Sequence, residues 1–185
     1  MKRNRSYTSK VIIMGQLQMR KEDYTALMKL EEAFERRDLS YFISFLKKSK
    51  EVPLLLRVHT VCMLEQIGNE DLVEPLCRVL KEDPSPLTRH EAAFTLGQLG
   101  YRSAVPALVE AMLNDESPIV RHESSVALSS IGDDSVLPQL EKAIRDRDED
   151  VRNSALIAFE YLTYLQRKRV STAKDAVVLK PKIRL

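Results

Sequence analysis

An internal repeat with a period of about 32 residues constrains the fold of this chain more than any other feature of its sequence. Residues 88–100 (TRHEAAFTLGQLG) align without a gap on residues 120–132 (VRHESSVALSSIG). Three residue types recur in the same frame: Arg57, Arg89, Arg121 and Arg152; Gly68, Gly100 and Gly132; Pro75, Pro106 and Pro138. Such a period is typical of solenoids, in which each unit buries its apolar face only by stacking on its neighbours.

Each unit of the repeat is predicted to consist of two helices. Residues 86–99 carry apolar side chains at helical spacing, namely Ala92, Ala93, Leu96 and Leu99. The partner helices are expected at about residues 71–82, 103–114 and 135–146. No segment alternates with the period of two that a half-buried strand requires, so no sheet is expected.

The ends of these helices are marked by residues with defined conformational preferences. Ser85-Pro86 and Ser117-Pro118 predict a serine N-cap followed by a proline at the first helical position. Gly100 predicts a left-handed stop at the helix end, and Gly132 repeats it. Three aspartates, Asp83, Asp115 and Asp146, each lie six residues before a repeat arginine. We expect an Asp–Arg ladder that ties each inter-helix turn to the next helix.

The motif V-R-x-x-A-x-x-A-L-x-x-I-G resembles the short HEAT-like repeats of the phycobilisome-lyase type, over roughly residues 38–168. This resemblance implies an all-α fold, an α-solenoid of about four HEAT-like helix pairs. Residues 23–36 are predicted to form an N-terminal capping helix, with an inner face of Leu27, Leu30, Ala33 and Phe34. The expected organisation is a basic arm at 1–22, a repeat domain at 23–168 and a basic tail at 169–185.

Charge and cysteine content exclude several classes of function. The net charge of +2 gives no general attraction to nucleic acid. Basic residues gather at the two ends of the chain, which are interpreted either as solvated ends or as a docking tail for an acidic partner. Cys62 and Cys77 lack a Cys-x-x-Cys partner, which excludes a thiolate zinc site, and both are expected to be small core residues. No apolar run reaches the roughly 20 residues of a membrane span, so a cytoplasmic protein is expected.

The His90-Glu91 dipeptide returns in frame as His122-Glu123, and the chain holds only three histidines. Helical periodicity places both dipeptides on the polar side of their helices. Neighbouring helices in a stack lie about 8–10 Å apart, so two histidines at matching heights can converge on one ion and a glutamate can complete three ligands. Two histidines and one carboxylate suit non-haem Fe(II). The competing interpretation of each pair is a solvated helix face.

Residues near the predicted site form a candidate substrate groove: Phe94, Gly97, Val126 and Ser129. Gly97 either leaves room for a substrate near the metal or permits close helix packing. The third histidine, His59, is in register with the glutamates and is interpreted as a satisfied or exposed helix residue. The fourth unit has Asn153-Ser154 in place of the His-Glu pair, and these side chains are not strong iron ligands.

The stretch R-H-E-A-A-F-T-L-G-Q-L followed by V-R-H-E-x-x-x-A-L resembles deoxyhypusine hydroxylase, over about residues 54–168. That family is a HEAT-repeat di-iron monooxygenase of two similar halves, each with two His-Glu pairs. The resemblance implies that His90, Glu91, His122 and Glu123 are iron ligands or near-ligands. Because this chain carries two pairs only, the site would hold either a single iron or a di-iron centre assembled across a homodimer.

Three readings of the function follow from the sequence. The first is an iron-dependent monooxygenase that acts on a protein or amine-bearing substrate at the concave helix face. The second is a non-catalytic scaffold that binds a protein partner on that face. The third is a chromophore lyase or its subunit, which the repeat class alone suggests and for which no tetrapyrrole pocket is evident.

Overall fold

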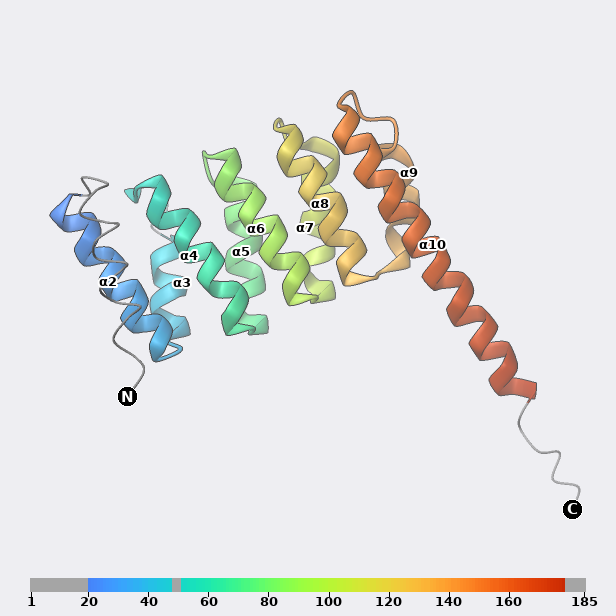
Figure 1. Cartoon of the computed structure of the whole chain (residues 1–185), viewed down its shortest axis with the longest axis horizontal. Coiled ribbons are helices and arrows are strands. Elements are labelled where there is room, and N and C mark those ends of the chain that lie inside the picture. The colour runs from blue at the N-terminus through green and yellow to red at the C-terminus, as the bar shows by residue number, and fades with distance from the viewer. Residues whose placement is uncertain (1–19, 48–50, 179–185) are drawn as a thin grey trace, which may run out of the picture.

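The computed structural model describes residues 20–47 and 51–178, with side chains described as far as residue 171. Within these residues all regular structure is helical (Figure 1), which confirms the predicted all-α solenoid. The α-helices are α2 (Lys21–Glu35), α3 (Leu39–Lys47), α4 (Leu54–Ile67), α5 (Val73–Glu82), α6 (Pro86–Leu99), α7 (Val105–Asn114), α8 (Pro118–Ile131), α9 (Leu137–Ala143) and α10 (Glu149–Val178). Short 3-10 helices at Glu70–Leu72, Arg102–Ala104 and Asp134–Val136 precede α5, α7 and α9.

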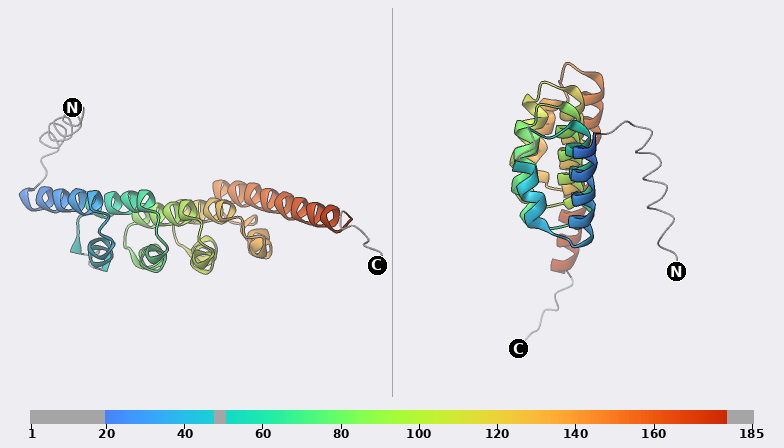
Figure 2. Two further views of the ribbon diagram at one scale, coloured as in Figure 1. Left: turned by 90° about the horizontal axis from the view of Figure 1, so that it is seen from below. Right: turned by 90° about the vertical axis from the view of Figure 1, so that its left-hand side faces the viewer.

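The helices form two layers that run side by side along the array (Figure 2). Helices α2, α4, α6, α8 and α10 contact one another in that order and make up the front layer. Helices α3, α5, α7 and α9 contact one another in order and make up the rear layer. After α2 and α3, the predicted repeats correspond to the pairs α4/α5, α6/α7 and α8/α9, and the fourth predicted unit, which contains Arg152, consists within the described residues of the single long helix α10.

The predicted helix over residues 86–99 coincides with α6, and its ends follow the expected residues. Pro86 occupies the first turn, and Gly100 ends the helix in the left-handed conformation with φ of 74°. The expected serine cap is wrong in one respect, because the Ser85 side chain makes no capping hydrogen bond. The turn is instead held by the Asp83 carboxylate, which accepts a hydrogen bond of 2.9 Å from the Ser85 backbone N–H.

Arginines and aspartates form a ladder as predicted, but the carboxylate that each arginine binds is not that of the aspartate six residues before it. Arg89 donates to both carboxylate oxygens of Asp115, at 2.8 and 2.9 Å, while its Nη1 donates to the Asp83 carbonyl at 3.0 Å. Arg89 therefore binds the backbone of the turn before its own helix and the carboxylate of the corresponding turn one repeat later. Arg57–Asp83 and Arg121–Asp146 repeat the ion pair at 3.0 and 2.8 Å.

Both layers contribute to the N-terminal cap of the array. Leu27, Leu30 and Ala33 of α2 are buried as predicted, and α3 adds the buried Phe42 and Leu46. These apolar residues close the first stacking face of the solenoid, as the capping prediction requires.

Three other predictions have different outcomes. Cys62 is exposed, so the prediction of a core cysteine is wrong there, while Cys77 is half-buried against the core. The predicted domain boundary at residue 168 falls inside α10, which runs on to Val178. The predicted basic arm lies almost entirely outside the described residues, and so does the tail beyond residue 178. Among the described helices, none is long and apolar enough to cross a membrane.

Candidate metal centre between helices α6 and α8

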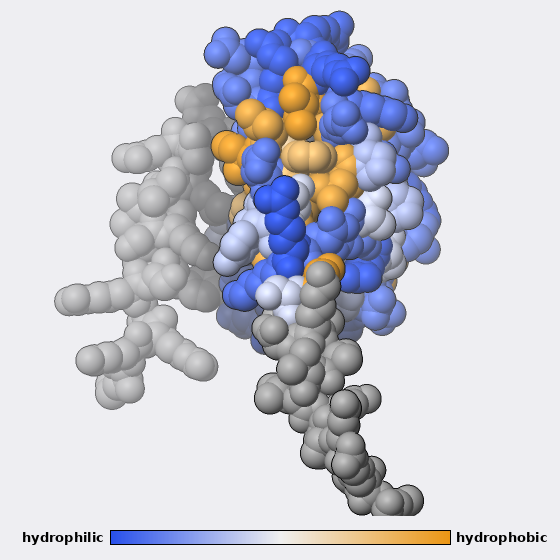
Figure 3. All heavy atoms as spheres, turned by 90° about the vertical axis from the view of Figure 1, so that its right-hand side faces the viewer, coloured by the Kyte–Doolittle hydropathy of each residue, from blue (hydrophilic) through white to orange (hydrophobic). Residues whose placement is uncertain are grey.

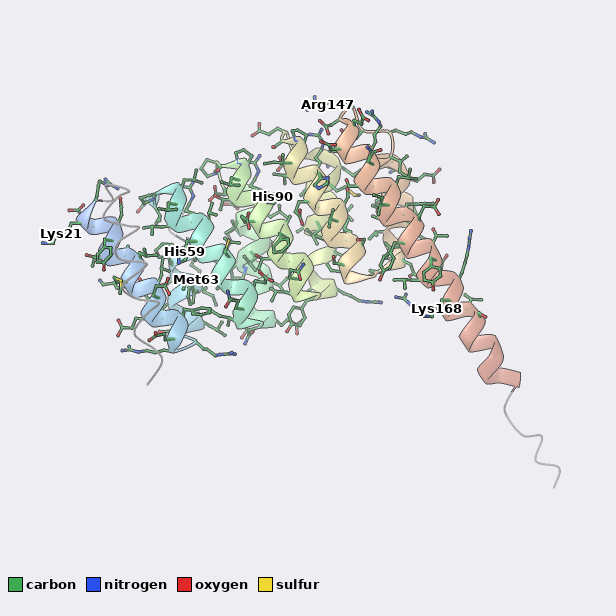
Figure 4. All side chains as sticks on the ribbon, in the orientation of Figure 1. Lys21, His59, Met63, His90, Arg147 and Lys168 are labelled. Carbon is green, nitrogen blue, oxygen red and sulfur yellow. The ribbon has the colours of Figure 1, made fainter. Side chains whose placement is uncertain are left out.

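The front layer brings three of the four predicted ligands together around His90. The Nε2 atom of His90 lies 3.4 Å from a carboxylate oxygen of Glu123 on α8. Its Nδ1 atom lies 3.5 Å from a carboxylate oxygen of Glu91 on α6. Figure 4 shows His90 on the front layer, with His59 on the preceding front helix. One imidazole is thus flanked by two carboxylates from two consecutive repeats.

Burial makes this arrangement electrostatically unusual. Glu123 is a buried carboxylate with 8% residue exposure, on a helix face that the competing interpretation had taken as solvated. His90 is half-buried, and its Nδ1 atom has no hydrogen-bond partner. Contact with the Glu123 carboxylate raises the pKa of His90, burial opposes that shift, and Glu91 adds to it. Buried polar atoms without a hydrogen bond are uncommon in folded proteins, so the Nδ1 atom of His90 is an unusual feature of this site.

The side chain of His122, like that of His90, points toward the next front helix, but there it contacts a different chemical group. Its Nδ1 atom lies 3.4 Å from the backbone carbonyl of Asp150, in the first turn of α10. In the repeat register, the residue of α10 that corresponds to Glu123 is Ser154. His90 and His122 therefore both face the next repeat, and of these two only His90 finds a glutamate there. The described arrangement does not bring His122 to His90.

Cys62 is a member of this cluster that the sequence analysis did not identify. Its thiol lies 3.5 Å from a Glu91 carboxylate oxygen and can donate a hydrogen bond to it. Although the residue as a whole is exposed, partial desolvation of its thiol raises the pKa of Cys62 to about 11, and the charge of Glu91 adds to this shift. The thiol therefore stays protonated at neutral pH. In the register it occupies the place of Phe94 one repeat earlier, which is the signal that could have indicated its position.

His59 is satisfied within the fold, as expected. Its Nε2 atom lies 3.2 Å from a Glu31 carboxylate oxygen on α2. It takes no part in the cluster around His90, and so it provides a matched control for histidine replacement.

The donor types of the cluster suit a divalent transition metal, while the described side chains do not converge on one point. Two ligands bound side by side to one metal ion lie about 3 Å apart, close to the 3.4 Å between His90 Nε2 and Glu123. A ligating histidine commonly gives its other ring N–H to a carboxylate, which is the position of Glu91. Among the described residues, no group of three His, Cys, Asp or Glu side chains is arranged to hold a metal ion. A third ligand would require movement of His122.

The four predicted groove residues lie along the same two helices. Phe94 and Ser129 are half-buried, and Val126 is 37% exposed. The Ser129 hydroxyl donates to the Val126 carbonyl at 2.8 Å. Gly97 is buried, and a Cβ atom built on it would stand 2.8 Å from both Cα and Cβ of Ala127. Close packing of α6 on α8 accounts for this glycine, and the groove itself remains a prediction.

Replacing Gly97 by alanine is expected to destabilise the protein by about 1–3 kcal/mol, although alanine normally favours a helix. The reason is the contact with the Ala127 backbone, which cannot yield without moving α8. Urea unfolding followed by circular dichroism measures the effect, with Gln98→Ala at the exposed neighbouring position as the control. A Gly97→Ala protein as stable as wild type would contradict the tight α6–α8 contact.

Comparisons with known proteins place this geometry among helical repeats. A family model for HEAT repeats matches residues 39–129 and 73–160. Human deoxyhypusine hydroxylase, solved in complex with glycerol, is 28% identical with a TM-score of 0.63, over 77% of this chain and 48% of that one. The chain therefore spans about half the length of that hydroxylase.

A second similar structure is the complex of CpcE and CpcF of phycocyanin lyase from Nostoc sp. PCC7120. It is 22% identical with a TM-score of 0.58, over 80% of this chain and 62% of that one, and this likeness shows the fold alone. No curated protein matches the sequence.

Proposed function

The chain belongs to the HEAT-repeat family, and we propose that it is a metal-binding member with one divalent iron ion between α6 and α8. The observation that supports this proposal is the buried Glu123 carboxylate, which lies 3.4 Å from His90 Nε2, with the Glu91 carboxylate 3.5 Å from the other ring nitrogen of His90. Bound iron would be held between this carboxylate and the imidazole nitrogen that faces it. The similarity to deoxyhypusine hydroxylase makes iron-dependent hydroxylation of a protein or amine-bearing substrate the associated reaction.

The proposed ligands are His90, Glu123 and His122, which form a set of two histidines and one carboxylate. His122 would join the other two by leaving the Asp150 carbonyl, to which its contact is long at 3.4 Å. Glu91 would act behind His90, where its carboxylate lies 3.5 Å from Nδ1 and would accept the Nδ1–H, which would direct Nε2 toward the ion. Cys62 can hold Glu91 in turn, through the contact of its thiol with the second carboxylate oxygen.

When bound, iron with open coordination positions would supply the activation of O₂. The chain's own residues would do the rest. Glu91 and Glu123 offset the charge of the ion and attract a cationic substrate group. Phe94 and Val126 are the apolar residues expected beside that group, and the front of α6 and α8 leaves Val126 accessible to it.

Anaerobic titration with Fe(II), followed by calorimetry and by metal content per chain, tests the proposal. Wild-type protein is expected to bind about one ion, and His90→Ala to bind at least roughly 100-fold more weakly because a first ligand is lost. His59→Ala should bind as wild type does, since the polar partner of His59 is Glu31 on α2 and not a residue of the cluster around His90. An absence of binding to wild type, or equal binding by His90→Ala, would overturn the proposal.

A protein-binding role without metal is the second candidate. It is favoured by the exposed large hydrophobic side chains on the described surface, five of which lie on α10: Leu156, Ile157, Tyr161, Tyr164 and Val170. In that case His90→Ala would leave partner binding unchanged, and no stoichiometric metal would be retained by the purified protein.

A further inference from the structure

The two ends of the described array differ in how they are closed. At the N-terminal end, α2 and α3 bury their own apolar residues, including Leu30 and Phe42. At the other end, α10 covers the side of α8 that faces along the array, and within the described residues no further front helix covers α10. Figure 3 faces this end and shows hydrophobic residues gathered within a hydrophilic border.

The repeat register identifies the uncovered positions. Arg152 corresponds to Arg121 in the repeat, so each position of α8 corresponds to the position 31 residues later in α10. Ser125 and Val126 correspond in this way to Leu156 and Ile157, which are 44% and 71% exposed. Tyr164, one to two turns later on the same side, is 58% exposed. Leu156 thus occupies a position that is buried between repeats in α8 but open at the end of the array, and Ile157 extends the apolar surface beside it. An uncovered stacking face of a solenoid needs a cover.

Charges along α10 are arranged so that the helix complements itself. Glu149 and Asp150 form an acidic first turn, and both are exposed. Arg167 is exposed near the other end of the apolar stretch. In an antiparallel pair of α10 helices centred between Ala158 and Phe159, the acidic turn of each helix lies opposite Arg167 of the other. Leu156 and Ile157 then lie opposite Tyr161 and Glu160, and Tyr164 opposite Asn153.

We propose that this end face is the contact between two copies of the chain, packed α10 against α10 in antiparallel orientation. The contact is isologous, since the same stripe serves both copies, and it closes after two chains. The acidic turn selects the antiparallel direction, because a parallel pair would place like charges together. This contact lies on the end of the array, away from the α6–α8 site, and it does not depend on metal binding.

Sedimentation velocity of the full chain over a range of concentrations tests this contact. Wild type is expected to be a dimer at micromolar concentration. Ile157→Glu should be a monomer over the same range, with at least a 10-fold weaker association. Leu55→Glu is the matched control, because Leu55 is 56% exposed on α4 and far along the array from α10. It should remain a dimer.

A charge exchange separates self-association from a general effect of the substitutions. Asp150→Arg and Arg167→Asp alone should each weaken the dimer, and the two together should restore it. Circular dichroism of each variant verifies the fold. A monomeric wild type would overturn the proposal and assign the face to another protein. An Ile157→Glu protein that dimerises like wild type, or a double exchange that does not recover, would also overturn it.

Discussion

Replacing Arg121 by methionine is expected to lower the free energy of unfolding by about 3–5 kcal/mol. The Arg121 side chain is 4% exposed and donates to both carboxylate oxygens of Asp146, at 2.8 and 2.9 Å. It also donates to the Asp115 carbonyl at 2.9 Å. Methionine fills similar space but leaves a largely buried carboxylate without its counter-charge, and that is the main cost. Urea unfolding at neutral pH measures the change.

Two companion variants make the Arg121 result interpretable. Arg121→Met/Asp146→Asn should be more stable than Arg121→Met alone, because the unpaired charge is gone while an acceptor for the Asp148 N–H remains. Arg145→Met removes an exposed ion pair with Glu141 at 3.9 Å and should cost less than about 0.5 kcal/mol. A loss for Arg121→Met as small as that for Arg145→Met would refute a structural role for the ladder.

The helices of the central repeats could be predicted from the sequence because each boundary depends on local chemistry. Proline is tolerated in the first turn of a helix but not in its interior, because it has no N–H and its ring clashes with the preceding turn. Glycine adopts the left-handed conformation at little cost, which favours it just after the end of a helix. Pro86 and Gly100 therefore fix α6 at both ends, and Pro118 and Gly132 do the same for α8. The partner helices begin later than predicted because 3-10 turns, such as Arg102–Ala104 before α7, occupy their first residues.

Contacts between repeats could not be read from the period in the same way. The six-residue spacing of Asp83 and Arg89 suggested a local ion pair, yet the Arg89 side chain extends forward to Asp115. The same forward direction applies to His90, which meets Glu123, and to His122, which meets the Asp150 backbone. Helical periodicity gives the face on which a side chain lies, whereas its partner depends on the stagger between neighbouring helices.

This stagger also explains why two His-Glu dipeptides yield one His–Glu contact between repeats. A histidine in one repeat needs a glutamate in the following repeat, so the last histidine of a series meets whatever comes next. Here that repeat carries Asn153-Ser154. The equivalence of His90 and His122 in the sequence therefore does not extend to their surroundings, and the proposed ligand set depends on a rotation of His122 that the sequence could not indicate.

The double replacement His122→Asn/Glu123→Ser is expected to abolish metal binding while it preserves the fold. It transfers the Asn153-Ser154 pair of α10 to the same register of α8. In α10 a serine fits this register, because Ser154 is buried and its hydroxyl donates to the Val151 carbonyl at 3.0 Å. The change removes a buried carboxylate whose desolvation is costly, and the partner left behind, His90, can become neutral by releasing a proton. The metal-free protein should therefore unfold at the wild-type temperature or higher. Metal affinity should fall by roughly 100-fold or more because two proposed ligands are lost.

Thermal unfolding with and without Fe(II) under anaerobic conditions measures both effects at once. A ligand at about 100 times its Kd stabilises the native state by about 2.7 kcal/mol, so wild type and His59→Ala should show a clear rise in unfolding temperature. The double variant should show none. A rise of the same size in the double variant would exclude His122 and Glu123 as ligands, since the ion would then bind elsewhere. A metal-free double variant that is less stable than wild type would mean that Glu123 serves the fold through its contact with His90, and that the carboxylate is retained for packing rather than for a metal.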